Sequence, residues 1–130
     1  MKYFLLYLII TATAVAAEIH IEFLFTHCAE VATSPRLVER ETRMEVKFDT
    51  ETMKGELKIY SPFSDSFETK LVTVSTASDG LHFLNIGETG VKVLSFGLFK
   101  GEATYSNSTV QYGVSLAYQL YGKGRFLEKR

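Results

Sequence analysis

Apolar and polar residues alternate with a period of two through most of this chain, and no other feature constrains its fold as strongly. Successive side chains of a β-strand point to opposite faces, so this period predicts strands with one apolar face. The longest such stretch is 110–120, in which six apolar residues occupy every second position. Further strands are predicted at 18–25, 42–48, 56–60, 69–75, 81–86, 91–99 and 102–106.

Short segments with turn chemistry separate these strands. They are Asp49 to Gly55, Ser61 to Ser66, Ser78-Asp79-Gly80, Gly87 to Gly90, Lys100-Gly101 and Asn107-Ser108, and Gly122-Lys123-Gly124 ends the last strand. Seven or eight short strands in sequential hairpins predict an all-β fold, an antiparallel sandwich or a small barrel. The alternative is an α+β fold in which one antiparallel sheet packs on a short helix, because Ser34-Pro35 has the chemistry of a helix start.

The N-terminus has the layout of a secretory signal peptide. Met1-Lys2 is a short positive start, Tyr3 to Val15 is apolar, and small residues follow up to Ala17. The apolar run is shorter than the roughly 20 residues that a membrane-spanning helix needs. The sequence therefore predicts a signal peptide at 1–17, cleaved near Ala17 (after Ala16 or Ala17), and one β-rich domain at 18–130. The expected location is secreted or periplasmic.

Charge and cysteine content exclude several classes of partner. Without Lys2 the mature chain carries 13 Lys and Arg against 15 Asp and Glu, a net charge of about −2. That balance predicts neither nucleic-acid binding nor attraction to an anionic membrane surface. The single cysteine, Cys28, forms no disulfide within its own chain, so packing must stabilise the domain; we expect a buried free thiol, with a bridge to a second chain as the alternative.

The chain shows no pattern typical of catalysis or of metal binding. His20, Glu22, His27, Cys28 and Glu30 are chemically suitable zinc ligands, but their spacing fits no standard pattern. Hydrolase and phosphate-binding motifs are missing, and His82 shares a strand face with Leu84 and Ile86, which is typical of a packed or hydrogen-bonded histidine. We therefore expect a protein that is not an enzyme, with no cofactor, metal or catalytic residue.

Two functions remain open. The first is non-enzymatic binding of another macromolecule, such as a protein of the cell envelope, as inhibitors of cell-wall hydrolases and immunity proteins of similar outline do. Its contacts are expected at an exposed sheet edge, in the loops 61–68 and 76–80 or in the tail after the last strand, and the candidate residues are Phe63, Phe67, Tyr121, Lys123 and Arg125. The alternative is a carrier of a small apolar ligand in a closed barrel, although fourteen Phe and Tyr in the mature chain favour a filled interior.

Three further expectations concern the last strands and the surface. Tyr112 and Tyr118 lie in the apolar row of 110–120, which predicts a core position for both. Asn107-Ser108-Thr109 is an N-glycosylation sequon in a predicted turn, relevant only in a eukaryotic secretory pathway. Integral membrane insertion of the mature chain is not expected, because 56–60 and 81–86 are too short for transmembrane strands and 43–47 carries a row of charges.

Overall fold

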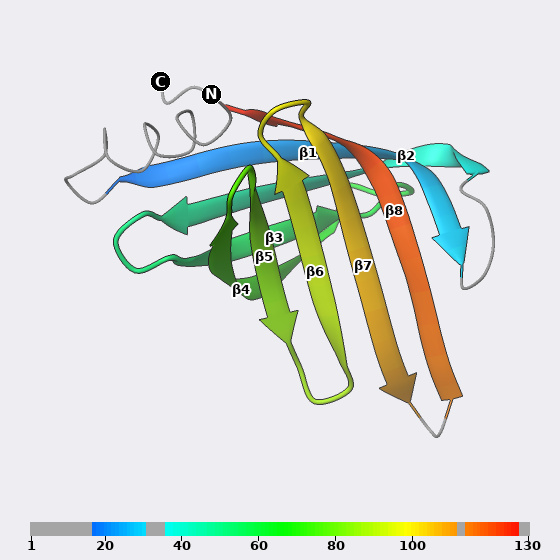
Figure 1. Ribbon diagram of the computed structural model, residues 1–130. Helices are drawn as coiled ribbons and strands as arrows, with labels where there is room; N and C mark the ends of the chain where they lie inside the picture. The colour runs from blue at the N-terminus through cyan, green and yellow to red at the C-terminus, as the bar shows by residue number, and fades with distance from the viewer. Residues whose placement is uncertain (1–16, 31–35, 112–113, 128–130) are drawn as a thin grey trace.

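Eight antiparallel strands form a closed barrel, in which each strand pairs with its neighbours in sequence and the last strand pairs with the first (Figure 1). The strands are β1 (Glu18–Glu30), β2 (Arg36–Asp49), β3 (Lys54–Tyr60), β4 (Phe67–Ala77), β5 (Gly80–Ile86), β6 (Gly90–Gly97), β7 (Glu102–Gln111) and β8 (Val114–Phe126). This computed structural model describes residues 17–30, 36–111 and 114–127, and only the backbone at 30, 36–39, 111 and 114–116. The all-β prediction is confirmed in its barrel form.

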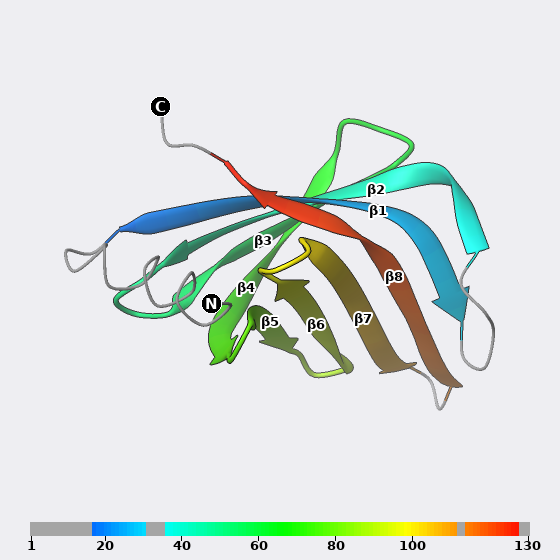
Figure 2. The ribbon, with the colours of Figure 1, turned by 45° about the horizontal axis from the view of Figure 1, so that its top comes forward.

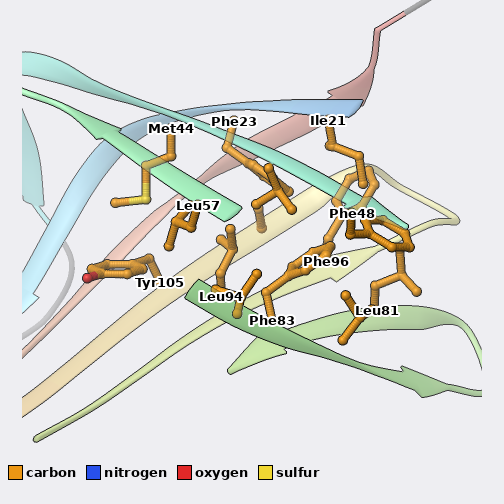
Figure 3. Close-up of a cluster of buried hydrophobic side chains, with 14 of the residues drawn as sticks. Ile21, Phe23, Met44, Phe48, Leu57, Leu81, Phe83, Leu94, Phe96 and Tyr105 are labelled. Carbon is orange, nitrogen blue, oxygen red and sulfur yellow. The ribbon is translucent and has the colours of Figure 1, made fainter. Parts of the chain in front are cut away.

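The apolar face of every strand points into the barrel. The buried core comprises Ile21, Phe23, Phe25, Met44, Val46, Phe48, Leu57, Val72, Val74, Leu81, Phe83, Leu94, Phe96, Ala103, Tyr105 and Leu120. Figure 3 shows labelled side chains of β1, β2, β3, β5, β6 and β7 converging on this interior. Alternation along each strand therefore decides which residues form the core, as the sequence predicted.

The large aromatic side chains gather toward one end of the barrel, which we call the closed end. Phe48 and Phe83 have ring centroids 5.6 Å apart, and the rings of Phe23 and Phe96 meet edge to face at 5.3 Å. The connections 50–53, 78–79 and 98–101 lie at this end, where β1 also begins and β8 ends. At the opposite end, which we call the open end, β3 connects to β4 through 61–66 and β5 to β6 through 87–89.

Closure of the barrel depends on β1 pairing with β8 across about a hundred residues, from Ile21 opposite Phe126 to Glu30 opposite Tyr118. A bulge between Phe25 and His27 interrupts both ladders of β1, and the strand bends in its last third (Figures 1 and 2). Gly122 lies beside this bulge, and a Cβ there would overlap the carbonyl oxygen of Leu24.

Several predicted boundaries were wrong. Asn107-Ser108 is not a turn but lies within β7, and Val110 belongs to β7, so the stretch 110–120 spans parts of two strands. Gly122-Lys123-Gly124 does not end β8, which continues to Phe126, because these glycines meet the close approach of β1. Strands also occupy much of 26–41, while the possible helix start at Ser34-Pro35 lies outside the described residues.

The outer face of β1, β2 and β8 carries a network of charged side chains. The Glu22 carboxylate lies 3.1 Å from Arg125 and 3.7 Å from Arg43, and Arg43 continues the network to Glu45 at 3.4 Å. Across β4 to β6 the outer face is more apolar, with exposed side chains such as Leu71 and Ile86. The described segments contain no helix long and apolar enough to cross a bilayer.

Candidate functional site

A cavity of about 710 Å³ occupies the open end of the barrel. Residues from β2, β3, β4, β6, β7, β8 and the β3–β4 connection line it, namely Thr42, Met44, Ile59, Tyr60, Ser61, Pro62, Ser66, Phe67, Glu68, Lys70, Lys92, Tyr105, Asn107, Tyr118 and Leu120. The volume lies within the range of roughly 300–1,000 Å³ that is usual for small-molecule sites. The interior is thus packed at one end and hollow at the other, so the expectation of a filled interior was wrong for the open end.

Apolar side chains form the inner part of this cavity, where it meets the core. Met44, Leu120 and the ring of Tyr105 are all at most 9 % exposed. Figure 3 shows Tyr105 near Met44 at one margin of the core cluster, with its hydroxyl oxygen directed away from the other labelled side chains. Burial raises the pKa of Tyr105 above its usual value, and the nearby Tyr118 and Glu68 raise it further. Tyr105 therefore remains a neutral phenol at any physiological pH.

Polar side chains cross the cavity wall at one level. Lys92 on β6 lies opposite Asn107 on β7, and Asn107 lies opposite Tyr118 on β8. All three face inward, because each lies two positions from a buried core residue of its own strand and therefore on the same face. Directly opposed residues on one face have Cβ atoms about 5 Å apart. The three side chains therefore form a continuous polar row, which we call the polar row.

Asn107 is only partly satisfied within this row. Its Nδ2 donates a hydrogen bond to the Tyr118 hydroxyl oxygen at 3.2 Å. Its Oδ1 is fully buried and has no hydrogen-bond partner among the described residues. A buried acceptor without a partner is destabilising by about 1–3 kcal/mol, so the residue is not there for stability alone.

Two lysines contribute positive charge to the cavity. Lys70 lies 3.9 Å from the carboxylate of Glu68, which is 72 % exposed, so the pair is weak. Lys92 forms no ion pair with any residue that the structure describes. Among the described residues of the lining Glu68 is the one acidic residue, against two lysines, so this part of the cavity has an excess of positive charge. Its chemistry suits a molecule with apolar surface and an anionic group.

The five residues predicted as partner contacts fall into two separate groups. Phe63 lies in the β3–β4 connection, 74 % exposed with Arg40 over its ring, and Phe67 opens β4 at the cavity rim, 5.5 Å from the ring of Tyr60. The others lie on the outer face of β8 and not in a tail, where Tyr121 donates to Gln119 and Arg125 pairs with Glu22. Lys123, also in β8, lies opposite Glu102.

The histidines and the cysteine take part in local contacts outside the cavity. His20 lies 3.3 Å from Glu45, His27 bonds to Thr26 at 2.8 Å, and His82 bonds to Ser95 at 2.8 Å. Cys28 is a half-buried free thiol packed against the core. Within the described ranges, no three His, Cys, Asp or Glu side chains approach closely enough to hold a metal ion.

Sequence reasoning missed the polar row, although one signal for it was present. Lys92 shares a strand face with Leu94 and Phe96, and a lysine among core positions needs an explanation. Tyr118 was expected in the core but is 37 % exposed in the cavity wall, while Tyr112 lies outside the described residues. Asn107 of the sequon lies in strand β7 and lines the cavity, and it does not lie in the turn that was predicted.

The comparisons with known proteins add no relationship: no protein-family model and no curated protein matches this chain. Any function must therefore be inferred from the barrel and its cavity.

Proposed function

We propose that this protein is a non-enzymatic carrier that binds a small, partly apolar molecule inside its barrel. The observation that carries the proposal is the division of the interior into a packed end and a cavity of about 710 Å³. An eight-stranded barrel is just wide enough to be filled by side chains or to hold one small ligand. Had packing been the only requirement, the open end would have been filled as the closed end is.

The closed topology also bears on the alternative of macromolecule binding. Each described strand has a neighbour on both sides, although β2 pairs with β3 only from Met44 onward and β4 pairs with β5 only from Thr73 onward. A macromolecular partner would have to contact these two stretches, the loops or the outer face. A small molecule bound in the cavity needs no contact surface on the outside of the barrel. The cavity therefore supports the carrier function over the binding of an envelope protein.

We propose further that the carrier is exported and water-soluble. The barrel begins with β1 at Glu18, directly after the predicted cleavage site at Ala17. On β1 and β2, charged residues such as Glu22 and Arg43 point outward while the apolar core faces inward, the reverse of a transmembrane barrel. The mass of the protein purified from its own host is expected to correspond to a chain starting at Glu18. Recovery of the uncut chain would refute export through signal cleavage.

A matched pair of tryptophan variants tests the carrier function. Thr42 lines the cavity, so Thr42→Trp places a bulky ring in the binding space. Thr73 is exposed on the outer face of β4, so Thr73→Trp makes the same change outside the barrel. With 8-anilinonaphthalene-1-sulfonate as an apolar fluorescent probe, we expect saturable binding to the native protein and to Thr73→Trp, and a loss of at least tenfold in affinity for Thr42→Trp. Equal binding by the two variants would place the probe elsewhere and refute the carrier.

A further inference from the structure

Within the proposed carrier function, on which this inference rests, the geometry points to a specific ligand class: an amphipathic monocarboxylate whose carboxylate binds at the polar row between Lys92 and Tyr118. The three residues of the row come from consecutive strands, so their side chains leave the wall at one level. Neighbouring strands lie about 4.8 Å apart, which places the two outer residues about 10 Å apart at the backbone. Both are long, and the residue between them is short.

Lys92 supplies the charge for this site. Its side chain enters the barrel on the same face as Leu94, which is fully buried, and it lines the cavity without an ion pair among the described residues. An ammonium group in a partly apolar cavity binds an anion more strongly than the same group on an open surface, because solvent screens it less. The charge therefore selects an anion among the apolar molecules that the cavity can hold.

Tyr118 supplies a second donor, and Asn107 positions it. The Nδ2 of Asn107 donates to the Tyr118 oxygen at 3.2 Å, so the hydroxyl hydrogen of Tyr118 is directed to another acceptor. Tyr118 is 37 % exposed in the cavity wall, which leaves that hydrogen within reach of a bound molecule. Lys92 and Tyr118 then present two donors on either side of the short Asn107, a match for the two oxygens of a carboxylate.

The apolar part of the ligand has its own surface. Met44 and Ile59 line the cavity from β2 and β3, the strands that face the polar row across the lumen. Leu120 and the Tyr105 ring continue this surface inward to the core. A molecule with one carboxylate and an apolar body would thus meet complementary groups on both sides of the cavity.

Decanoate and decan-1-ol, which share an apolar chain and differ in the head group, test the inference by titration calorimetry. We expect the native protein to bind decanoate about tenfold more tightly than the alcohol, the scale of a charge-assisted hydrogen bond. Lys92→Met should remove this preference without weakening the binding of decan-1-ol, and Lys92→Arg should retain it. Tyr118→Phe should reduce the preference in part. Lys47→Met, which removes an exposed lysine from the outer face of β2, is the matched control and should behave as the native protein.

Each other outcome has a distinct meaning. If the native protein binds both compounds with equal affinity, or if Lys92→Met keeps the preference, the carboxylate site is refuted and the carrier function stands. If neither compound binds and the fluorescent probe also fails to bind, the carrier function itself is refuted. If Lys92→Met weakens both compounds equally, the lysine acts on the shape of the cavity and not on charge, which again overturns the inference.

Discussion

Replacing Asn107 with leucine is expected to stabilise the empty barrel by about 1 kcal/mol. The substitution removes a buried Oδ1 that has no partner among the described residues, and such a group costs about 1–3 kcal/mol. It also removes the 3.2 Å hydrogen bond to Tyr118, worth about 1 kcal/mol, but Tyr118 is 37 % exposed and water can replace that bond. The gain from removing the orphaned oxygen therefore exceeds the loss.

Asn85→Leu is the matched control, and the opposite sign is expected for it. Asn85 also lies in a strand, on the same face as the buried Phe83, but its Nδ2 donates to the Leu71 carbonyl oxygen at 2.8 Å. Leucine there breaks this bond and removes no orphaned group, a loss of about 1 kcal/mol. The higher strand propensity of leucine acts on both variants, so it cancels in the difference of about 2 kcal/mol.

Urea unfolding followed by far-ultraviolet circular dichroism measures this difference, since the chain contains no tryptophan for a fluorescence assay. With a slope of about 2 kcal/mol per molar urea, the midpoints of the two variants should lie about 1 M apart, on opposite sides of the native midpoint. Equal shifts in the same direction would refute the reasoning, because strand propensity or volume would then explain both variants. Destabilisation of Asn107→Leu alone would show that the Oδ1 has a partner in solution.

The remaining predictions concern the core, the buried phenol and the surface. Leu94→Ala should cost about 3 kcal/mol in urea unfolding, because its side chain is fully buried, whereas Leu71→Ala, 72 % exposed, should change stability by less than about 0.5 kcal/mol. Burial raises the pKa of Tyr105 in the folded state, so the stability that this residue contributes is complete below about pH 10 and falls as the pH rises further. Between about pH 9 and pH 11 the native protein should therefore lose more stability than Tyr105→Phe. Equal losses would contradict the burial of this phenol. Glu22→Gln removes the charged partner of Arg125 and should lower the free energy of unfolding by less than about 1 kcal/mol. Because the pair is partly exposed, this loss should disappear in about 1 M salt, and a loss that persists there would contradict solvent screening of the pair.

Most of the strands could be predicted because alternation is a local property. Each strand has one face in the core, so a residue such as Leu57 or Val74 reveals its orientation through neighbours two positions away. Turn residues were less reliable guides. Asn107 and Gly122 have turn chemistry, yet one lines the cavity from a strand and the other accommodates the bulge of β1. Both roles arise from contacts with distant strands, which local sequence does not encode.

The cavity could not be predicted from composition for a related reason. The fourteen Phe and Tyr residues of 18–130 do not spread evenly through the barrel, because register places the rings of Phe23, Phe48, Phe83 and Phe96 together. Register depends on closure between β1 and β8, the most distant pair of strands in the chain. The number of aromatic residues therefore limits the volume of the core, but it does not show at which end of the barrel the core lies.

The distribution of polar groups ties stability to the proposed function. At the closed end the interior is apolar and tightly packed, and both ends of the described chain lie there. At the open end Lys92 lines the cavity, and the buried Asn107 Oδ1 has no partner among the described residues, which lowers the stability of the empty barrel. Sequences depart from local consistency mainly at functional sites. If Asn107→Leu gains stability while losing its preference for decanoate over decan-1-ol, Asn107 lowers the stability of the empty barrel and contributes to ligand binding. The decanoate carboxylate would then give Lys92 the anionic partner that it lacks among the described residues, and the native barrel should gain stability with decanoate concentration by mass action.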